Sequence, residues 1–492
     1  MSSSTNFRPD YQTAIIGAGF GGLGMGIKLK MQGDDSFIIF ERADELGGTW
    51  RDNNYPGCAC DVPSSLYSFS FDQNPNWSKA FSNQPEILEY LKACAVKFNI
   101  REKIRFNSDV NHAEFDEHTG CWTIQCQDGF GITARFLISA MGPLNRPKIP
   151  HFPGIESFGG EIWHSAEWRH DVPLEGKRVA SIGTGASAIQ YIPEIAPDVR
   201  RLDVYQRSAP WVTPRNDAPR RPWVKRLFQR FPLFMNLHRS WIYWMLEMRV
   251  FWFLGKSEAI KKFAKSEALK HIEAGISDPE LRQRVTPNYT IGCKRVLVSD
   301  DYYPALNRQN VELVTSPIQE IQPNCIIDAD GNKRPTDIII LGTGFVASEF
   351  LTDMQVIGRG GRKLFDEWNS TGGPEAYAGI QVSGYPNLFF LLGPNTGLGH
   401  NSVVHIIESN YNYIFDYMRM VQEKNVPFLD IDPAAQADFN SDLQDKLDKT
   451  VWQSGGCTSW YQTDAGRNTT LWPGSTVAYR RLTRRVNQEA FQ

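Results

Sequence analysis

Two glycine-rich segments, set in the same local pattern, constrain the fold of this 492-residue chain more than any other feature. In the first, an apolar run at 13–16 leads into GAGFGG at 17–22 and then into a helix-like stretch. In the second, an apolar run at 178–182 leads into GTGASA at 183–188. A strand, a glycine loop and a helix in this order are typical of a dinucleotide-binding βαβ unit. The loop residues expected to contact the two dinucleotides are Gly17, Gly19, Gly22, Gly183, Thr184, Gly185, Ala186 and Ser187.

The strand that follows each loop ends in a residue of opposite charge. Glu41 and Arg207 both lie 24 positions after the first glycine of their units. A carboxylate accepts hydrogen bonds from a free ribose diol and repels a 2′-phosphate, whereas an arginine binds that phosphate through charge-assisted hydrogen bonds. The matched offset therefore predicts FAD in the first unit and NADPH in the second.

Three further apolar runs complete the predicted architecture. The runs at 134–142 and 336–345 are typical of strands that carry the chain from one domain to the other. The segment 386–402 reads as a buried strand, a glycine-rich loop containing Asn395, which we expect to contact FAD, and a helix whose N-terminus could face the flavin ring. We predict an α/β fold with two Rossmann-like dinucleotide-binding domains and a helical insert. The predicted bounds are 1–148 with 350–492 for the FAD domain, 149–213 with 293–349 for the NADPH domain, and 214–292 for the insert.

Bulk composition excludes several classes of protein. A formal net charge of -3 argues against a nucleic-acid partner, and 41% hydrophobic residues are ordinary for a globular protein. The eight cysteines are scattered without a CxxC pair, so we expect reduced thiols and no metal site. The polar N-terminus lacks a signal-peptide core, which favours a cytoplasmic location.

One aromatic-rich stretch, WIYWMLEMRVFWFLG at 241–255, is the most apolar part of the predicted insert. Glu247 and Arg249 interrupt it, and a membrane-spanning helix would tolerate both charges badly. We therefore favour a partly buried helix, or one that lines an apolar pocket at the substrate entrance. Peripheral membrane contact is the less favoured alternative.

Two longer motifs make the prediction more specific. The stretch FGGEIWHSAEW at 158–168 matches FxGxxxHxxxW, and residues 48–61 match GxWxxxxYPGxxxD. Over nearly its whole length the chain resembles the type I Baeyer–Villiger monooxygenases, a branch of the flavin-containing monooxygenases. That resemblance implies an FAD enzyme that consumes NADPH and O2 and converts ketones to esters or lactones through a C4a-peroxyflavin. The first motif is carried by Phe158, Gly160, His164 and Trp168, and the second by Gly48, Trp50, Tyr55, Pro56, Gly57 and Asp61.

The resemblance also implies roles for individual residues. Arg295 is the implied catalytic residue, because an anionic intermediate in a dry pocket needs a fixed cation, and Asp61 positions it. Lys294 joins Arg207 and Ser208 at the 2′-phosphate. Further residues implied to contact the flavin are Thr49, Trp50, Arg51, Asp52, Asp61 and Tyr67, and those implied to contact NADP are Ala59, Cys60, Arg295 and Trp460.

Taken singly, several of these residues have plainer explanations. His164 alone would more often be a structural histidine, so our hypothesis is that His164 and Trp168 anchor an interdomain linker rather than catalyse. A flavin-dependent N- or S-oxygenase is the nearest alternative function. A disulfide reductase would need a redox dithiol, for which only Cys58 and Cys60 are candidates. A nucleotide-sensing protein without catalysis is the third alternative.

Overall fold

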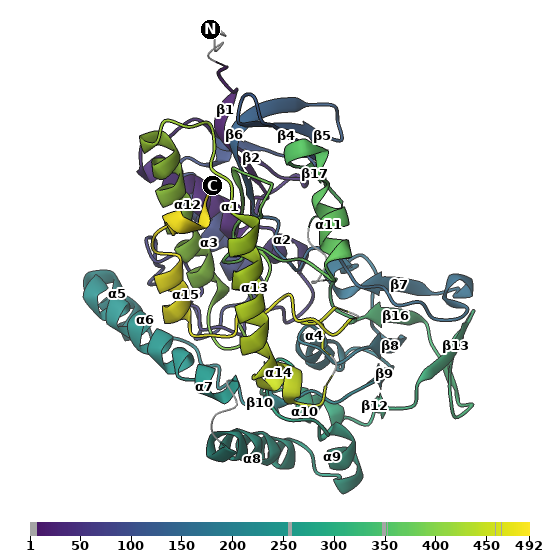
Figure 1. Cartoon of the computed structure of the whole chain (residues 1–492). Coiled ribbons are helices and arrows are strands. Elements are labelled where there is room, and N and C mark those ends of the chain that lie inside the picture. The colour runs from purple at the N-terminus through teal and green to yellow at the C-terminus, as the bar shows by residue number, and fades with distance from the viewer. Residues whose placement is uncertain (1–6, 254–257, 347–350, 352, 458, 464) are drawn as a thin grey trace.

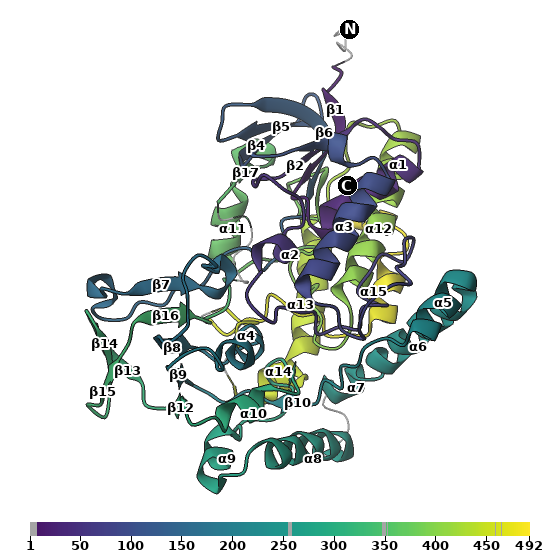
Figure 2. The same cartoon turned by 180° about the vertical axis from the view of Figure 1, so that it is seen from behind.

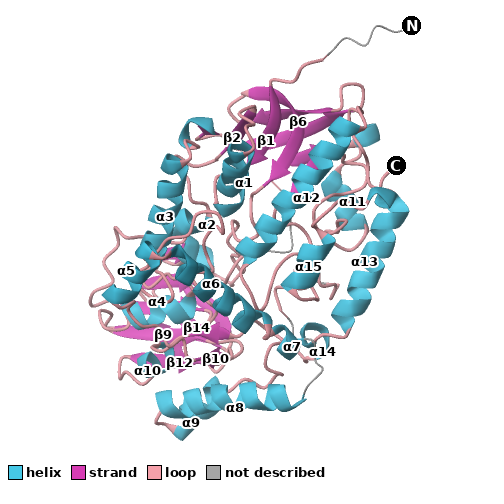
Figure 3. Ribbon diagram, turned by 90° about the vertical axis from the view of Figure 1, so that its left-hand side faces the viewer, coloured by secondary structure: helices cyan, strands magenta, loops and turns pink. Residues whose placement is uncertain are grey.

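Two β-sheets, each built around one of the glycine-rich units, form the frame of the molecule (Figure 1). The computed structural model describes residues 7–253, 258–346, 351, 353–457, 459–463 and 465–492. Figure 3 shows the two sheets as separate layers, with helices α1 (Phe20–Met31) and α12 (Val403–Glu423) packed beside the first. The predicted α/β class is confirmed.

The first sheet has a parallel core and an antiparallel extension. Strand β1 lies between β2 and β6, parallel to both, and each contributes apolar side chains to the core. Strands β4, β5 and β6 form an antiparallel meander. In spatial order the strands are β17 (Gln355–Ile357), β4 (Val110–Asp116), β5 (Cys121–Cys126), β6 (Gly131–Ser139), β1 (Tyr11–Ile16), β2 (Phe37–Phe40) and β3 (Ile104–Arg105), with β18 (Leu388–Phe390) paired to β6.

The second sheet is entirely parallel. Its order is β12 (Val311–Val314), β9 (Arg201–Tyr205), β8 (Arg178–Ile182), β16 (Ile338–Leu341) and β7 (Glu161–His164). A separate antiparallel sheet is formed by β13 (Ile318–Gln322), β14 (Cys325–Asp328) and β15 (Lys333–Pro335). The two glycine-rich units thus occupy equivalent places, β1-α1-β2 and β8-α4-β9, with α4 spanning Ala188–Ile195.

The chain crosses between the two sheets twice. It leaves the first sheet after β6, and it leaves the second after β16. The two crossings lie side by side, because Pro147 and Phe345 form a β-bridge and the Lys148 N–H donates to the Gly344 carbonyl at 2.8 Å. The predicted boundary at 148 falls in the first crossing. The boundary at 349–350 lies outside the described residues, so the bounds of the predicted domains stay a prediction.

The insert between the two parts of the second sheet is helical. Short strands β10 (Val212–Thr213) and β11 (Leu297–Val298) pair and bring its two ends together. Figure 2 shows its first helices as an arm along the outside of the molecule. The helices are α5 (Pro222–Arg230), α6 (Pro232–Glu247), α7 (Val250–Phe253), α8 (Glu258–Gly275) and α9 (Pro279–Val285).

The aromatic-rich stretch departs from what we expected of it. It is helical, and Ile242 and Leu246 are buried as predicted. Trp241, Trp244 and Met248, however, face outward and are more than half exposed, so they do not line a pocket. Within the described parts of the chain, no helix combines the length and hydropathy needed to cross a membrane.

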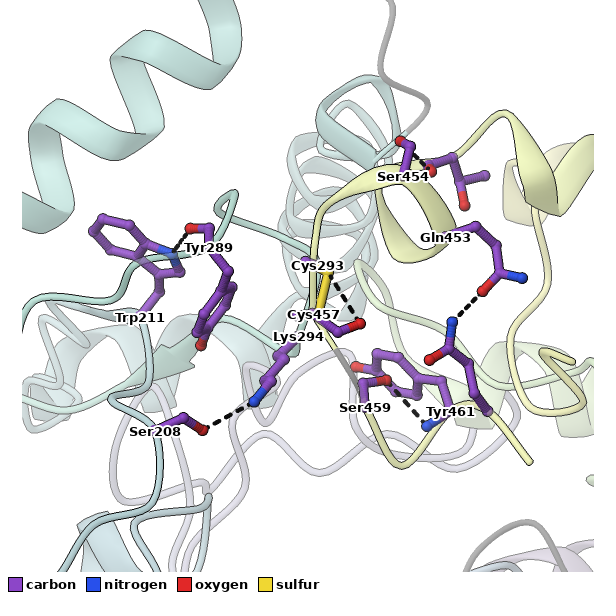
Figure 4. The surroundings of a disulfide bond; sticks show 12 residues. Ser208, Trp211, Tyr289, Cys293, Lys294, Gln453, Ser454, Cys457, Ser459 and Tyr461 are labelled. Atoms are coloured by element: carbon purple, nitrogen blue, oxygen red, sulfur yellow. Dashed lines mark hydrogen bonds between the residues drawn. A yellow bond between two sulfur atoms is a disulfide. The ribbon is translucent and has the colours of Figure 1, made fainter. Parts of the chain in front are cut away.

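A disulfide bond between Cys293 and Cys457 contradicts the expectation that all thiols are reduced. The two cysteines are 164 residues apart in sequence, so no local spacing could indicate their pairing. In the tertiary structure their Cα atoms are 6.1 Å apart. Figure 4 shows the bond and its surroundings. The bond joins the segment after the insert to the C-terminal part of the chain.

The remaining helices pack around both sheets: α11 contacts β17 of the first sheet, whereas α10 contacts α4 and β12 of the second unit. Helices α1, α3 and α12 pack together, and α12 also contacts α15. The bounds are α2 (Thr49–Asp52), α3 (Gln84–Lys97), α10 (Tyr302–Leu306), α11 (Leu364–Ser370), α13 (Pro433–Asp448), α14 (Val451–Ser454) and α15 (Thr476–Leu482).

Candidate active site

The first glycine loop makes a turn that only small residues allow. Gly17 has a φ of 102°, and a Cβ there would lie 2.8 Å from the carbonyl oxygen of Ala140 at the end of β6. A Cβ on Gly22 would collide with the Gly17 carbonyl oxygen. No side chain caps the N-terminus of α1, so its first amides are free to bind phosphate oxygens.

Glu41 lies directly after β2 and is 4% exposed. Its carboxylate accepts hydrogen bonds from the Ala18 amide at 2.9 Å and from the Arg51 guanidinium at 2.8 Å. Arg51 also donates to Asp52 at 2.8 Å. Burial lowers the pKa of Arg51, but the carboxylates of Glu41 and Asp52 more than offset this and raise it. Three predicted FAD contacts therefore form one network beside the first loop.

Trp50 and Tyr67 lie against the same loop. The Trp50 indole donates to the Tyr67 hydroxyl at 3.1 Å, and the Tyr67 ring packs edge-on against Phe20 at the start of α1. A Cβ on Gly48 would lie 3.1 Å from the Cα of Gly19. The structure thus places the segment 48–52 directly on the first glycine loop.

Asn395 has a structural role that its sequence position did not reveal. It adopts a φ of 56°, and its side-chain amide donates to the carbonyls of Asn468 at 2.8 Å and Leu471 at 3.2 Å. These bonds hold two loops of the C-terminal region together. Its contact with a flavin stays a prediction.

The second glycine loop repeats the geometry of the first. Gly183 has a φ of 110°, and a Cβ there would collide with the Gly342 carbonyl after β16. Ala188, in the third position, is fully buried, which explains why a small side chain suffices there. A Cβ on Gly185 would meet nothing within 4 Å, and no side chain caps α4. The approach to this helix N-terminus is therefore open.

A group of basic residues lies where β9 ends. The Lys294 ammonium donates to the Ser208 hydroxyl at 2.9 Å (Figure 4). Arg207 directly precedes Ser208 in the chain. Partial burial and the charge of Arg207 lower the pKa of Lys294. Among the described residues, no carboxylate lies within salt-bridge distance of Arg207 or Lys294. The two cations repel each other, and a bound phosphate would relieve this repulsion.

The implied catalytic pair is in contact. The Arg295 guanidinium donates to the Asp61 carboxylate at 3.1 Å. The Arg295 side chain keeps 42% of its surface accessible, so a ligand can reach its charge. Partial burial lowers the pKa of Arg295, but Asp61 outweighs this and raises it. Arg295 therefore stays protonated at any physiological pH.

Gln190 is a site residue that the sequence did not indicate. Its amide donates to the Asp61 carboxylate at 3.2 Å and to the Ala59 carbonyl at 3.1 Å, and its Oε1 accepts from the Tyr55 hydroxyl at 3.0 Å. Gln190 belongs to α4, the helix of the second unit, while the other three belong to the YPGxxxD segment. A Cβ on Gly57 would lie 2.7 Å from the Gln190 carbonyl. Gln190 thus couples the Asp61 segment to the second unit.

Trp460 lies in a segment that the disulfide ties to the Lys294–Arg295 region. Its ring packs against Tyr461, with centroids 4.4 Å apart, and its side chain is 43% exposed. Cys457, three residues before it, is bonded to Cys293, which directly precedes Lys294. The aromatic segment and the two basic residues are therefore covalently linked neighbours.

Comparison with known proteins decides the family. A model described as flavin-binding monooxygenase-like matches residues 10–359. A Baeyer–Villiger monooxygenase of Pseudomonas aeruginosa is 47% identical over 481 residues, which cover 98% of this chain and 91% of that one. Another from Streptomyces coelicolor is 44% identical over 493 residues, covering 100% and 94%. The chain belongs to the Baeyer–Villiger branch of the flavin-binding monooxygenase-like family.

Several solved structures are similar to this chain over almost its whole length. An oxidized steroid monooxygenase bound to NADP superposes with a TM-score of 0.84 at 30% identity, over 96% of this chain and 97% of that one. The structure of OTEMO in complex with FAD and NADP superposes with a TM-score of 0.88 at 28% identity, over 99% of this chain and 100% of that one. A closed crystal structure of cyclohexanone monooxygenase superposes with a TM-score of 0.87 at 27% identity, over 98% of both chains. The two-domain fold predicted from the glycine loops is confirmed.

The cysteines of this Baeyer–Villiger family member do not suit a disulfide reductase, the second alternative function. Cys58 and Cys60 are free and buried. Burial raises the pKa of each thiol to about 12. Neither is a thiolate near neutral pH, so neither can attack a disulfide efficiently.

The family fingerprint at 158–168 lies on the edge of the second sheet. β7 pairs with β16, with His164 opposite Leu341. A Cβ on Gly160 would collide with the Asp337 carbonyl, so this glycine allows the close approach at the start of the strand. The Phe158 ring lies over Gly160 and packs with the core of this sheet.

His164 and Trp168 of the fingerprint contact different parts of the molecule. His164 is 1% exposed, accepts a hydrogen bond from the Ala166 amide at 3.1 Å, and packs edge-on against Phe345 in the second crossing. Trp168 packs against Tyr191 of α4. Burial lowers the pKa of His164, so it is neutral at pH 7.

Proposed function

We propose that the chain binds FAD at its first glycine loop and NADPH at its second, and uses O2 to convert ketones to esters or lactones. The observation that carries this proposal is the Arg295–Asp61 pair, held between the two nucleotide units by Gln190 of α4. A Baeyer–Villiger reaction needs a permanent cation where negative charge develops, and this pair supplies one.

The first unit fits FAD. The uncapped N-terminus of α1 and the glycine turn offer amides for the pyrophosphate, and Glu41 lies at the ribose position. Arg51 neutralises the buried Glu41 carboxylate and holds it in place. Trp50 and Tyr67 provide flat, rigid surfaces beside the loop, suited to a flavin ring.

The second unit fits NADPH rather than NADH. The uncapped N-terminus of α4 suits the pyrophosphate. Arg207, Ser208 and Lys294 form the anion site that a 2′-phosphate would fill. We propose that Trp460, whose segment is tied by the disulfide to the residue before Lys294, covers the nicotinamide end of the coenzyme.

The protein groups have separable tasks in the reaction. When bound, reduced flavin supplies the activation of O2 that inserts an oxygen atom beside the carbonyl carbon. Arg295 stabilises negative charge and stays protonated when water is excluded. Asp61 orients the Arg295 guanidinium and offsets the cost of burying it. Gln190 holds the other oxygen of Asp61, so the carboxylate cannot rotate freely.

Substitution of Arg295 tests the proposal. In Arg295→Ala, NADPH should still reduce the flavin within a few-fold of the wild-type rate, while ester formation should fall by about 100-fold or more. Stopped-flow absorbance measures the first step, and product analysis with a panel of cyclic, linear and aryl ketones measures the second. Arg169→Ala, which removes surface ion pairs with Asp171 and Glu161, is the control for loss of an arginine and should change neither.

Two results would contradict the proposal. Unchanged ester yield in Arg295→Ala would remove Arg295 from the reaction. Wild-type enzyme that sulfoxidises thioethers but forms no ester from any ketone would instead be an S-oxygenase, the alternative considered above.

A further inference from the structure

We propose that helices α5, α6 and α7 form an interfacial surface, residues 221–251, that docks the enzyme onto a negatively charged lipid bilayer. This surface lies on the outer side of the insert (Figures 1 and 2). It is separate from the proposed catalytic chemistry and does not depend on it.

The outer face of α6 is an unbroken apolar stripe. Leu233, Leu237, Trp241, Trp244 and Met248 follow one another at spacings of three or four residues, and each is between 57% and 67% exposed. With 3.6 residues per turn, these side chains lie within an arc of about 80°. Side chains of this size at this exposure normally mark a binding surface.

The exposed apolar residues of the protein concentrate here. Among the described residues, ten of the seventeen large hydrophobic side chains that are exposed fall within 221–251. They are Trp223, Phe231, Leu233, Phe234, Leu237, Trp241, Trp244, Met245, Met248 and Phe251. Such a cluster differs from the scattered exposed hydrophobics of an ordinary surface.

The inner face of α6 is firmly attached to the protein, so the outer stripe is not an unpacked core face. Ile242 and Leu246 are buried against Leu66. The Arg239 guanidinium donates to the Ser65 carbonyl at 2.6 Å and to the Ser68 carbonyl at 3.0 Å. The helix therefore has two apolar faces, one used by the fold and one turned outward.

The positive charge of this surface favours an anionic partner. Between residues 218 and 246 the chain has six arginines and lysines and no aspartate or glutamate, although its overall charge is -3. Arg221, Arg226 and Arg230 are exposed, and no carboxylate in the described part of the chain lies within salt-bridge distance of them. Basic residues beside exposed tryptophans and leucines are typical of helices that lie in the interface of anionic membranes.

A second copy of the chain fits this surface less well. In a twofold dimer the same patch faces itself, so its positive charges would oppose one another. Anionic headgroups neutralise them instead. The 16 residues of α6 extend about 24 Å, less than the roughly 30 Å of a bilayer core, and its inner face is occupied by protein. The geometry thus favours a helix lying in the plane of the interface.

The proposed membrane-binding surface also lies close to the Asp61 segment. The inner face of α6 packs on Val62 and Leu66, which lie between Asp61 and Tyr67 in sequence. A membrane-bound enzyme would therefore hold its Asp61 segment one helix layer from the lipid. An apolar ligand dissolved in the bilayer would have a short path to that segment.

Vesicle flotation of the FAD-bound enzyme tests the proposal. The enzyme should float with phosphatidylcholine vesicles containing about 30% phosphatidylglycerol, bind pure phosphatidylcholine at least about 10-fold more weakly, and be released by high salt. The double variants Trp241→Ser/Trp244→Ser and Arg226→Glu/Arg230→Glu should each lower the partition coefficient by about 10-fold. Val96→Ser, which removes an equally exposed apolar residue on α3, should bind like the wild type.

Three outcomes would overturn the proposal. The first is no flotation of the wild type with either vesicle. The second is flotation that neither double variant reduces, although circular dichroism shows both folded. The third is a lipid-free dimer in light scattering that dissociates in Trp241→Ser/Trp244→Ser, which would make the surface an interface between copies of the chain.

Discussion

Arg207 and Lys294 are the two residues that we propose select the coenzyme. Both carry positive charge at the end of β9, and Ser208 is the hydrogen-bond partner of the Lys294 ammonium. A 2′-phosphate would complete this site, whereas the hydroxyl of NADH would leave the two cations facing each other.

We therefore expect Arg207→Ala to discriminate against NADPH alone. Losing one charge-assisted hydrogen bond should raise KM for NADPH by about 10- to 100-fold, with little change for NADH. Steady-state kinetics with both coenzymes measure the ratio. An equal loss for both would show that Arg207 supports the fold rather than the 2′-phosphate.

Sequence motifs identified some of the site residues but not all of them. Glu41, Arg207 and Asp61 could be found because each has a fixed offset from a glycine or belongs to a continuous motif. Gln190 belongs to neither, and its role arises only because α4 packs against the YPGxxxD segment.

At the scale of elements, the disulfide joins a segment near the second unit to the one that carries Trp460. Replacing Cys457 by serine should remove about 2–4 kcal/mol of stabilisation from this region. We expect faster hydrogen exchange in residues 455–461 and a higher rate of NADP⁺ release. Mass spectrometry and stopped-flow displacement measure the two effects.

The same substitution has internal controls. Cys293→Ser and the double variant should behave like Cys457→Ser, because either change breaks the bond. Dithiothreitol should reproduce the effect in the wild type and have none on the variants. If reductant left exchange in 455–461 unchanged, the bond would not restrain that segment.

Glu247 links the arm to the loop before α12. It is 5% exposed and accepts hydrogen bonds from the Asn401 amide and the Thr476 hydroxyl, both at 2.7 Å. Burial raises the pKa of Glu247, but hydrogen bonds with His400, Thr476 and Asn401 lower it to about 2 from 4.5. Because the folded pKa is depressed, the stabilisation is full above pH 4.5 and is lost as pH falls toward 2.

Glu247→Gln should therefore destabilise the docking of α6 at neutral pH by about 3 kcal/mol, with the difference from the wild type shrinking below about pH 4.5. Limited proteolysis between 213 and 292, followed at several pH values, measures the change. Equal protection of both proteins at neutral pH would remove Glu247 as an anchor of the arm. Glu258→Gln, on the exposed face of α8, is the control.

At this scale, periodicity predicted the helices of the insert but not which way α6 faces. Its apolar residues are numerous enough to make two apolar faces, and sequence alone does not say which face packs on Leu66. The exposed stripe became visible only when the contacts of Arg239 and Leu246 fixed the orientation of the helix.

At the scale of the whole molecule, two crossings that lie side by side and run in opposite directions join the sheets, and His164 packs where the second one leaves β16. The Phe345 ring that it contacts belongs to that crossing and is bridged to Pro147 of the other. This placement supports the hypothesis that the fingerprint governs how the second unit moves relative to the first.

His164→Ala should slow turnover by about 10- to 100-fold through coenzyme exchange and flavin reduction, while the Arg295 charge stays in place. Phe345→Ala, which removes the other ring of the contact, should slow the same step. Single-turnover stopped-flow resolves each step. Wild-type rates throughout in His164→Ala would end the proposed linker role.

The sequence by itself determined the two nucleotide units, their charge preference, the family motifs and the helical nature of the insert. These depend on local chemistry: a glycine turn, a strand end and a helix start occupy neighbouring positions along the chain. Only the tertiary structure decided the Cys293–Cys457 bond, the role of Gln190 and the outward face of α6. Each of these depends on contacts between segments far apart in sequence, which no local spacing encodes.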